Sequence, residues 1–439
     1  MKQFGWRTSL VFAGLATIIS AQAQDWPQWR GANRDARAAF KAPATWPKEL
    51  KEKWKVTVGD GVATPALVGD RIYVFSREND NEVIRCLEAA TGKEVWQDKY
   101  ESLGATGPAQ SFSGPRSSPT VAEGKVVTLG VRGVLSCLDA ASGKVLWRKH
   151  DIKAYPQFHP SSSPMIVDGI CIAQLGGREG GVIAAYDLAS GDEKWKWSGS
   201  SPAYASPTLM TLDGTKLVIA QTDSDTVALN AKDGTLAWKS SGEGGQQAEG
   251  GGQGGGGRGR GGGGGRDYKA ATPIVDGQSI IIAGRGIKAI QLAKEGDKIV
   301  VKPLWSNADK SVIFNTPVLK SGVVYGLTGN NELFAVDSKD PQAGWTAPFP
   351  TGEAAPAAAE GGRGRGRGGG GFGSIVDVGS ALLALTPGGR LVVFEPNAKE
   401  LKVLANYKVS DSQTHAHPVA SGNRIFIKDQ NSVALLTLE

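Results

Sequence analysis

Two short clusters contain residue types that bind metal ions. His415 and His417 stand two positions apart, which places both imidazoles on one side of an extended segment. Asp223 and Asp225 share a short loop and offer the carboxylate oxygens that calcium prefers, although two acids supply only part of its coordination shell. Because neither cluster has a further ligand beside it, hydrogen-bonding or turn roles are favoured, and we predict no metal site.

The motifs of the common hydrolases and nucleotide-binding proteins are missing from the sequence. It contains no Gly-x-Ser-x-Gly, no P-loop and no His-Glu-x-x-His. Cys86, Cys137 and Cys171 each lie in an apolar segment without a Cys-x-x-Cys pattern, so we interpret them as small core residues. We therefore predict no catalytic residue and no cofactor.

Polar side chains in the connections between apolar segments are the remaining candidates for ligand binding. Such residues converge at one end of a ring-shaped fold, where ligand sites are common. The candidates are Arg116, Arg132, His159, Arg178, Glu179, Asp223, Asp225, Arg285, Asn330, Asn331, Asp429 and Asn431. Scattered polarity is also ordinary for loops, so a solvated turn is the alternative for each.

A repeat that occurs eight times positions these connections. Each copy opens with a Ser/Thr-Pro step or a variant of it and closes about forty residues later with a turn and an aromatic residue, as in Cys137–Trp147 and Ala185–Trp195. The segments between, such as Ser279–Ala283, are short and β-branched, which predicts strands. The Gly of each turn supplies a positive φ.

This period predicts an all-β fold, an eight-bladed β-propeller of four-stranded antiparallel blades. One extra strand around Trp54 precedes the first repeat, and we expect it to complete the last blade beside Ser432–Leu436 and so close the ring. The alternative, a β-sandwich, is not favoured because it is not built from eight equal repeats. The aromatic residues expected to fill the gaps between blades are Trp54, Trp96, Trp147, Trp195, Trp238, Trp305 and Trp345.

Three regions divide the chain. Residues 1–23 combine basic residues, an apolar stretch and Ala21-Gln-Ala23, which predicts a signal peptide. Residues 24–50 form an N-terminal extension and 51–439 the propeller. No Cys adjoins the predicted cleavage site and no later segment is apolar enough to span a membrane, so we expect a monomeric periplasmic or secreted protein.

Two glycine-rich inserts, residues 242–266 and 353–373, carry six arginines between them. We interpret them as flexible loops, and the alternative is a pair of arms that attract an anionic polymer. The formal net charge of +6 includes Lys2 and Arg7 of the predicted signal, so the mature chain is only mildly basic. This charge predicts weak attraction to acidic surfaces and no specific nucleic-acid site.

The copies of Ala-Asp-x-x-Thr-Gly-Lys-x-x-Trp resemble the pyrroloquinoline-quinone-like (PQQ-like) repeat family. That family includes quinoprotein alcohol dehydrogenases and the propeller lipoprotein of the outer-membrane barrel assembly machinery. The resemblance runs from Trp54 to the end of the chain, and the opening Asp25–Gly31 with Asn33 and Arg34 resembles secreted single-propeller members. It implies eight blades joined through their tryptophans. The adjacent cysteines of the dehydrogenases and the lipidated cysteine of the lipoprotein are both missing.

The predicted function is an exported, non-catalytic propeller that binds through its loop-rich face, either an envelope protein or an anionic polysaccharide. The alternative is a PQQ- and calcium-dependent alcohol or sugar dehydrogenase of the cell envelope. In that alternative the metal and the quinone carboxylates are held by residues from the set Asp223, Asp225, Asn330, Arg285 and Arg178.

Overall fold

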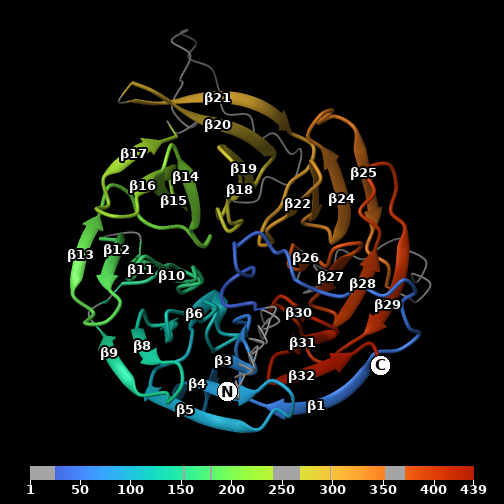
Figure 1. Cartoon of the computed structure of the whole chain (residues 1–439), viewed down its shortest axis with the longest axis horizontal. Coiled ribbons are helices and arrows are strands. Elements are labelled where there is room, and N and C mark those ends of the chain that lie inside the picture. Colours follow the sequence, from blue (N-terminus) through green and yellow to red (C-terminus); the bar gives the residue numbers. More distant parts are fainter. Residues whose placement is uncertain are drawn as a thin grey trace, which may run out of the picture.

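The computed structural model describes residues 25–150, 152, 154–177, 180–240, 267–296, 298–351 and 371–439. Within them, strands β1 to β32 form eight four-stranded antiparallel sheets. The sheets stand as blades around a common centre (Figure 1), which confirms the predicted eight-bladed β-propeller. The predicted signal peptide and the first glycine-rich insert lie outside the described residues, as does the second insert except for residues 371–373. No helix in the described part of the chain is long and apolar enough to cross a membrane.

Each of the first seven blades runs from an inner strand to an outer strand in chain order. Blade one consists of β2 (Ala66–Val68), β3 (Arg71–Glu78), β4 (Asn81–Glu88) and β5 (Glu94–Glu101), and blade two of β6 (Thr120–Ala122), β7 (Lys125–Leu129), β8 (Leu135–Asp139) and β9 (Val145–Lys149). Blade three consists of β10 (Met165–Val167), β11 (Ile170–Leu175), β12 (Val182–Asp187) and β13 (Glu193–Trp197). Blade four consists of β14 (Thr208–Leu212), β15 (Thr215–Gln221), β16 (Thr226–Asn230) and β17 (Leu236–Lys239). A single 3-10 turn, η1 (Gly107–Ala109), precedes β6 in the described chain.

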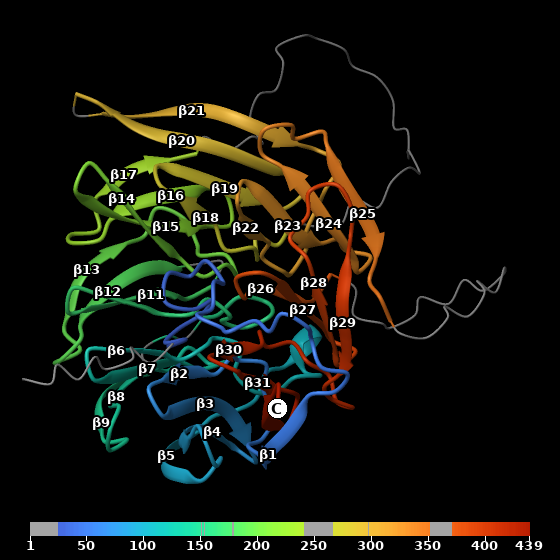
Figure 2. The ribbon, with the colours of Figure 1, turned by 45° about the vertical axis from the view of Figure 1, so that its right-hand side comes forward.

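The second half of the ring repeats this order. Blades five to seven are β18 (Ile274–Asp276), β19 (Ser279–Ala283), β20 (Ile287–Glu295) and β21 (Lys298–Asn307); β22 (Val318–Lys320), β23 (Val323–Leu327), β24 (Glu332–Asp337) and β25 (Gly344–Pro348); and β26 (Ser374–Asp377), β27 (Leu382–Thr386), β28 (Arg390–Phe394) and β29 (Val403–Lys408). The long hairpin β20–β21 extends along the rim (Figure 2).

The eighth blade joins the two ends of the propeller. It consists of β30 (Val419–Ser421), β31 (Arg424–Lys428), β32 (Ser432–Thr437) and, as its outer strand, β1 (Lys51–Thr57). β1 pairs antiparallel with β32, and Trp54 stands opposite Leu435. The predicted closure by the strand around Trp54 is therefore confirmed, and the last blade has four strands like the other seven.

Tryptophans on the outer strands bridge one blade to the next. The Trp96 Nε1 donates to the Ala140 carbonyl at 3.1 Å, and Trp147 makes the same bond to Leu188. The ring of Trp96 lies so close to Gly143, whose φ is 73°, that a Cβ there would stand 2.5 Å from it. The turn glycine is therefore required both for its φ and for the approach of the neighbouring indole. Trp54, Trp195 and Trp345 also donate to carbonyls of the next blade, while Trp238 and Trp305 pack against apolar clusters between blades.

The segment 25–41, called the N-terminal hub below, fills the centre of the ring beneath the loops (Figure 1). It hydrogen-bonds to every blade, at Leu67, Val121, Pro164, Pro207, Thr272, Pro317, Asp377 and Gly422 in turn. Trp26, Arg30 and Arg34 of the hub are buried almost completely. The N-terminal extension is thus a central part of the propeller and not an appendage.

Candidate functional site

Seven connections between the outer strand of one blade and the inner strand of the next meet at one end of the central channel. Each of them contributes a ring to one series of contacting aromatic side chains. These rings, called the aromatic mouth below, are Phe112, Phe158, Tyr204, Tyr268, Phe314, Phe372 and His415. All seven are half-buried, so part of each ring is accessible to a partner.

The rings of the aromatic mouth contact one another in an unbroken series. Phe314 stacks on Phe372 with centroids 4.4 Å apart and on Tyr268 at 5.3 Å. The series continues from Tyr268 to Tyr204 and Phe158, and from Phe372 through His415 to Phe112. Each such pair contributes about 0.5–1.5 kcal/mol beyond the area it buries. The mouth is therefore an ordered aromatic surface.

The predicted candidates Arg116 and Arg132 hold the first of these connections in place. The Arg116 guanidinium donates to the carbonyls of Ala109, Phe112 and Gly114 at 2.8, 2.8 and 3.0 Å. Burial lowers the pKa of Arg116 to about 10. Arg132 donates to the Leu103 and Gly104 carbonyls and to the Tyr155 hydroxyl, and lies over the Tyr155 ring. Both arginines are therefore positioned to shape the face.

His159 is a buried hydrogen-bonding residue beneath the same connection. Its Nε2 accepts from the Thr106 amide and its Nδ1 donates to the Val131 carbonyl, both at 3.0 Å. Burial lowers the pKa of His159, which favours the neutral ring that these two bonds require. Its backbone is left-handed, with φ 65°, and the two side-chain bonds hold that conformation.

The turns between the second and third strands carry most of the other candidates. Asp223 accepts from Ser200 at 2.8 Å, and Asp225 accepts from Ser224. Asn331, with φ 60°, accepts from the Gly371 amide beside Phe372, and the exposed Asn330 lies next to it. Arg285 lies in the exposed turn between β19 and β20. Arg178 and Glu179 are outside the described residues.

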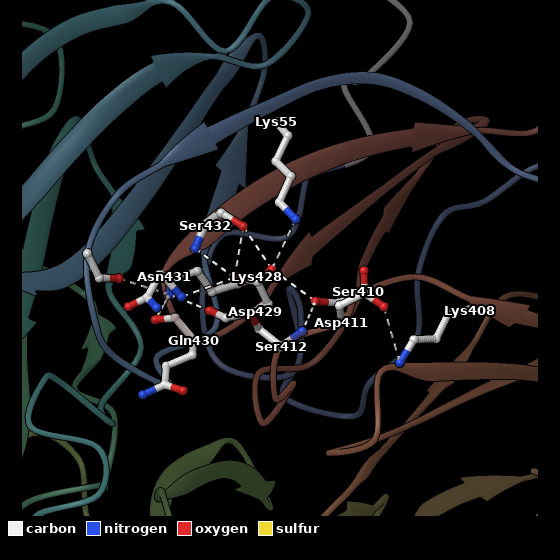
Figure 3. Close-up of polar contacts among 11 residues, drawn as sticks. Lys55, Lys408, Ser410, Asp411, Ser412, Lys428, Asp429, Gln430, Asn431 and Ser432 are labelled. Atoms are coloured by element: carbon white, nitrogen blue, oxygen red, sulfur yellow. Dashed lines mark hydrogen bonds and ion pairs between the residues drawn. The ribbon is translucent and has the colours of Figure 1, made fainter.

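Asp429 is buried in a hydrogen-bond network at the ring closure, to which the exposed Asn431 contributes its backbone amide (Figure 3). The Asp429 carboxylate accepts from Ser410 and Ser432 side chains and from the Asn431 and Ser432 amides. Burial opposes its ionisation, but the bonds from Ser432, Ser410 and Asn431 outweigh burial and lower the pKa of Asp429. This carboxylate fastens the last turn of the chain to the connection that precedes β30.

Lys428 lies beside this network with its ammonium among four carbonyl oxygens. Its Nζ is 2.6–3.3 Å from the carbonyls of Gly59, Gly61, Asp429 and Gln430 (Figure 3). Burial lowers the pKa of Lys428 to about 8. The ammonium joins the segment after β1 to the turn after β31, so its role belongs to ring closure.

The two histidines with metal-ligand spacing face different surroundings. His415 joins the aromatic mouth between Phe112 and Phe372, whereas His417 is buried against Trp29 of the hub. Among the described residues, no three His, Cys, Asp or Glu side chains are grouped to hold a metal ion. Cys86, Cys137 and Cys171 are buried and free, and burial raises the pKa of each thiol.

Sequence reasoning missed both the aromatic mouth and the hub arginines. A signal for the mouth exists at three positions, because Tyr204, Phe314 and His415 each stand three residues before the proline that opens their blade. Phe112, Phe158 and Tyr268 stand at other distances from their prolines. The hub arginines bond to carbonyls of the opener segments, which any residue type provides, so no pattern marks their partners.

Comparisons with known proteins agree with this architecture. Residues 79–347 match a family model described as outer membrane protein assembly factor BamB. Quinohemoprotein alcohol dehydrogenase ADH IIB of Pseudomonas putida is 35% identical over 124 residues, which are 26% of this chain and 17% of that protein. BamB of Burkholderia pseudomallei (strain K96243) is 27% identical over 198 residues, 44% of this chain and 46% of that protein. The chain thus spans less than half the length of these curated relatives.

Solved structures show the same fold at low sequence identity. BamB from Moraxella catarrhalis superimposes with a TM-score of 0.55 at 14% identity, over 88% of this chain and 99% of that one. Quinohemoprotein alcohol dehydrogenase from Comamonas testosteroni has a TM-score of 0.60 at 14% identity, over 95% and 81% of the two chains. At these identities the likeness concerns the propeller itself.

Proposed function

The chain belongs to the PQQ-like propeller family described as outer membrane protein assembly factor BamB, and on that premise we propose that it is an exported, non-catalytic binding module. Its contact surface is the loop-rich face, and its partner is a component of the cell envelope. The names of the curated relatives support an envelope location, since they include an outer membrane protein assembly factor.

The aromatic mouth is the observation that carries this proposal. Arg116 holds its own connection in place, and Arg132 joins the turn after β7 to that connection, both through backbone carbonyls. The half-buried aromatic rings are part of the accessible surface of this face, and aromatic side chains supply large contact areas in protein interfaces. A rigid face of this kind is suited to binding without chemistry.

Dehydrogenase activity is the second candidate, because quinohemoprotein alcohol dehydrogenases are among the relatives. The residues present do not fit a calcium and quinone centre. Asp223 and Asp225 accept from serine hydroxyls, and the described chain contains no cluster of three metal-binding side chains. The three cysteines cannot form the disulfide between adjacent cysteines that the dehydrogenases contain, since they are buried in separate strands.

Two measurements test the proposal. The purified full chain, mixed with PQQ and calcium, should reduce no dye with alcohols or aldose sugars beyond the protein-free rate; turnover would establish the dehydrogenase instead. Photo-crosslinking in the producing cells should give adducts when the probe replaces Leu103, which is 71% exposed on the loop-rich face. The matched control places the probe at Leu146, 40% exposed on the outer strand β9, and equal adduct yields would contradict the proposal.

A further inference from the structure

Resting on the proposed function, we infer that the aromatic mouth takes an extended polypeptide and binds its large apolar side chains. The partner is thus a protein segment and not a polysaccharide. Three observations support this inference. Several polar side chains around the mouth are hydrogen-bonded within the protein, apolar residues are exposed beside it, and the rings are held in place by one another.

Several polar side chains of the described residues around the mouth already have partners within the protein. Arg116 serves three carbonyls, and the Asn315 amide donates to the Leu327 and Gly371 carbonyls. The Asp60 Oδ2 accepts from the Ser113 amide and hydroxyl and from the Gly114 amide, whereas its Oδ1 is buried without a hydrogen-bond partner among the described residues. A polysaccharide has hydroxyl groups along its whole length, and each loses water bonds on binding unless the protein replaces them. These engaged groups favour an apolar ligand.

Two exposed aliphatic residues extend the mouth. Leu103 is 71% exposed beside the loop that carries Phe112, and Ile313 is 36% exposed next to Phe314 and against Gly371. Ile313 adjoins the rings directly, and Leu103 belongs to the same connection as Phe112. Large apolar surfaces with a polar surround mark sites of protein contact.

The rings are already ordered before any ligand arrives. Phe314 is fixed between Tyr268 and Phe372, and the loops beneath are fastened to the second-to-third strand turns, as by the bonds from Val312 to Gly284 and from Thr414 to Pro387. Binding therefore costs little side-chain entropy. Because seven of the eight connections contribute a ring, the surface recognises apolar side chains in several registers and does not require one sequence.

The test measures the binding of a short fluorescent peptide that alternates Phe and Ser to the purified full chain, by anisotropy. Tight binding should be lost when the Phe residues are replaced by Ala. The double variant Tyr268→Ala/Phe314→Ala should bind about tenfold more weakly, and Leu103→Ser, which changes an exposed residue, should also weaken binding. Leu236→Ala, 39% exposed on the outer strand β17, is the matched control and should bind as the unmodified chain does.

Competition separates this inference from the proposed function. An acidic oligouronate that binds the mouth, with loss of binding in the double variant, would overturn the polypeptide inference and leave the binding function in place. Peptide binding that the mouth variants do not change would also overturn the inference. No binding of either probe, together with equal crosslinks at Leu103 and Leu146, would overturn both. Unchanged melting temperatures in Leu103→Ser keep these results independent of folding.

Discussion

The hub and the aromatic mouth occupy the same channel but use their side chains in opposite ways. In the hub, Arg34 is 3% exposed and donates to carbonyls of two blades, at Ser163, Pro164 and Pro207. In the mouth, the rings contact one another and stay half-buried. One end of the channel therefore stabilises the ring through buried polar contacts, whereas the other keeps apolar surface available. Stability and binding are assigned to separate regions.

The arginines of the hub are buried, and burial of a charged group costs free energy. Burial lowers the pKa of Arg30 to about 10 and that of Arg34 to about 9. Arg30 offsets that burial with bonds to the Thr316 and Pro317 carbonyls at 2.9 and 2.7 Å. Such groups contribute stability only while every partner is present, since a buried polar group left unpaired costs about 1–3 kcal/mol.

The largest effect is expected for Arg34→Met in the hub. The change leaves buried carbonyls of two blades without these donors, so we expect a loss of roughly 3–6 kcal/mol in the free energy of unfolding. Equilibrium urea unfolding measures it. Arg37→Met is the control, because Arg37 has a side chain that is 55% exposed. Equal losses in the two variants would break the contrast between hub and surface.

The second prediction concerns acid. Burial lowers the pKa of His415 to about 4 and that of His417 well below its ordinary value. The unfolded chain therefore binds more protons, and stability falls as the pH drops from about 6.5 toward 4, by up to about 1.4 kcal/mol per pH unit for each group. Unfolding free energies across this range measure the slope.

Substitution of each histidine by Asn distinguishes the two regions. His417→Asn should remove the contribution of one histidine to the pH dependence of the unfolding free energy across the whole range from about pH 6.5 to 4, because His417 is enclosed by the hub. His415→Asn should reduce the pH dependence less near pH 4, because the folded protein begins to protonate the His415 ring there. Identical slopes in both variants and the unmodified chain would show that neither ring is held neutral.

The smallest effect is expected for Arg116→Met in the mouth. Arg116 also serves three carbonyls, as Arg34 does, but its side chain is only half-buried. Water replaces some of the lost bonds, so we expect roughly 1–2 kcal/mol in the urea experiment. A loss as large as that of Arg34→Met would show that the loop-rich face stabilises the ring as strongly as the hub.

The propeller was predictable because its signals are local and repeated. The Gly of each turn, the β-branched strands and the outer tryptophans recur within each unit, so eight copies report the same structure. The closing strand could be predicted for a related reason, since Trp54 lacked a blade of its own before the first repeat. The polar site candidates remain predictions; the structure shows the hydrogen bonds that several of them make within the loops.

The hub and the mouth could not be predicted in the same way, because their contacts join residues far apart in the chain. Arg34 meets carbonyls 129 to 173 positions later, and backbone carbonyls have no sequence signature. Phe314 and Phe372 stack across 58 positions of chain, from connections of unequal length. The sequence alone determined the number and kind of blades and the strand that closes them, since these depend on short-range periodicity. Only the tertiary structure decided what fills the channel and which side chains meet at its mouth, because closing the ring is what brings those residues together.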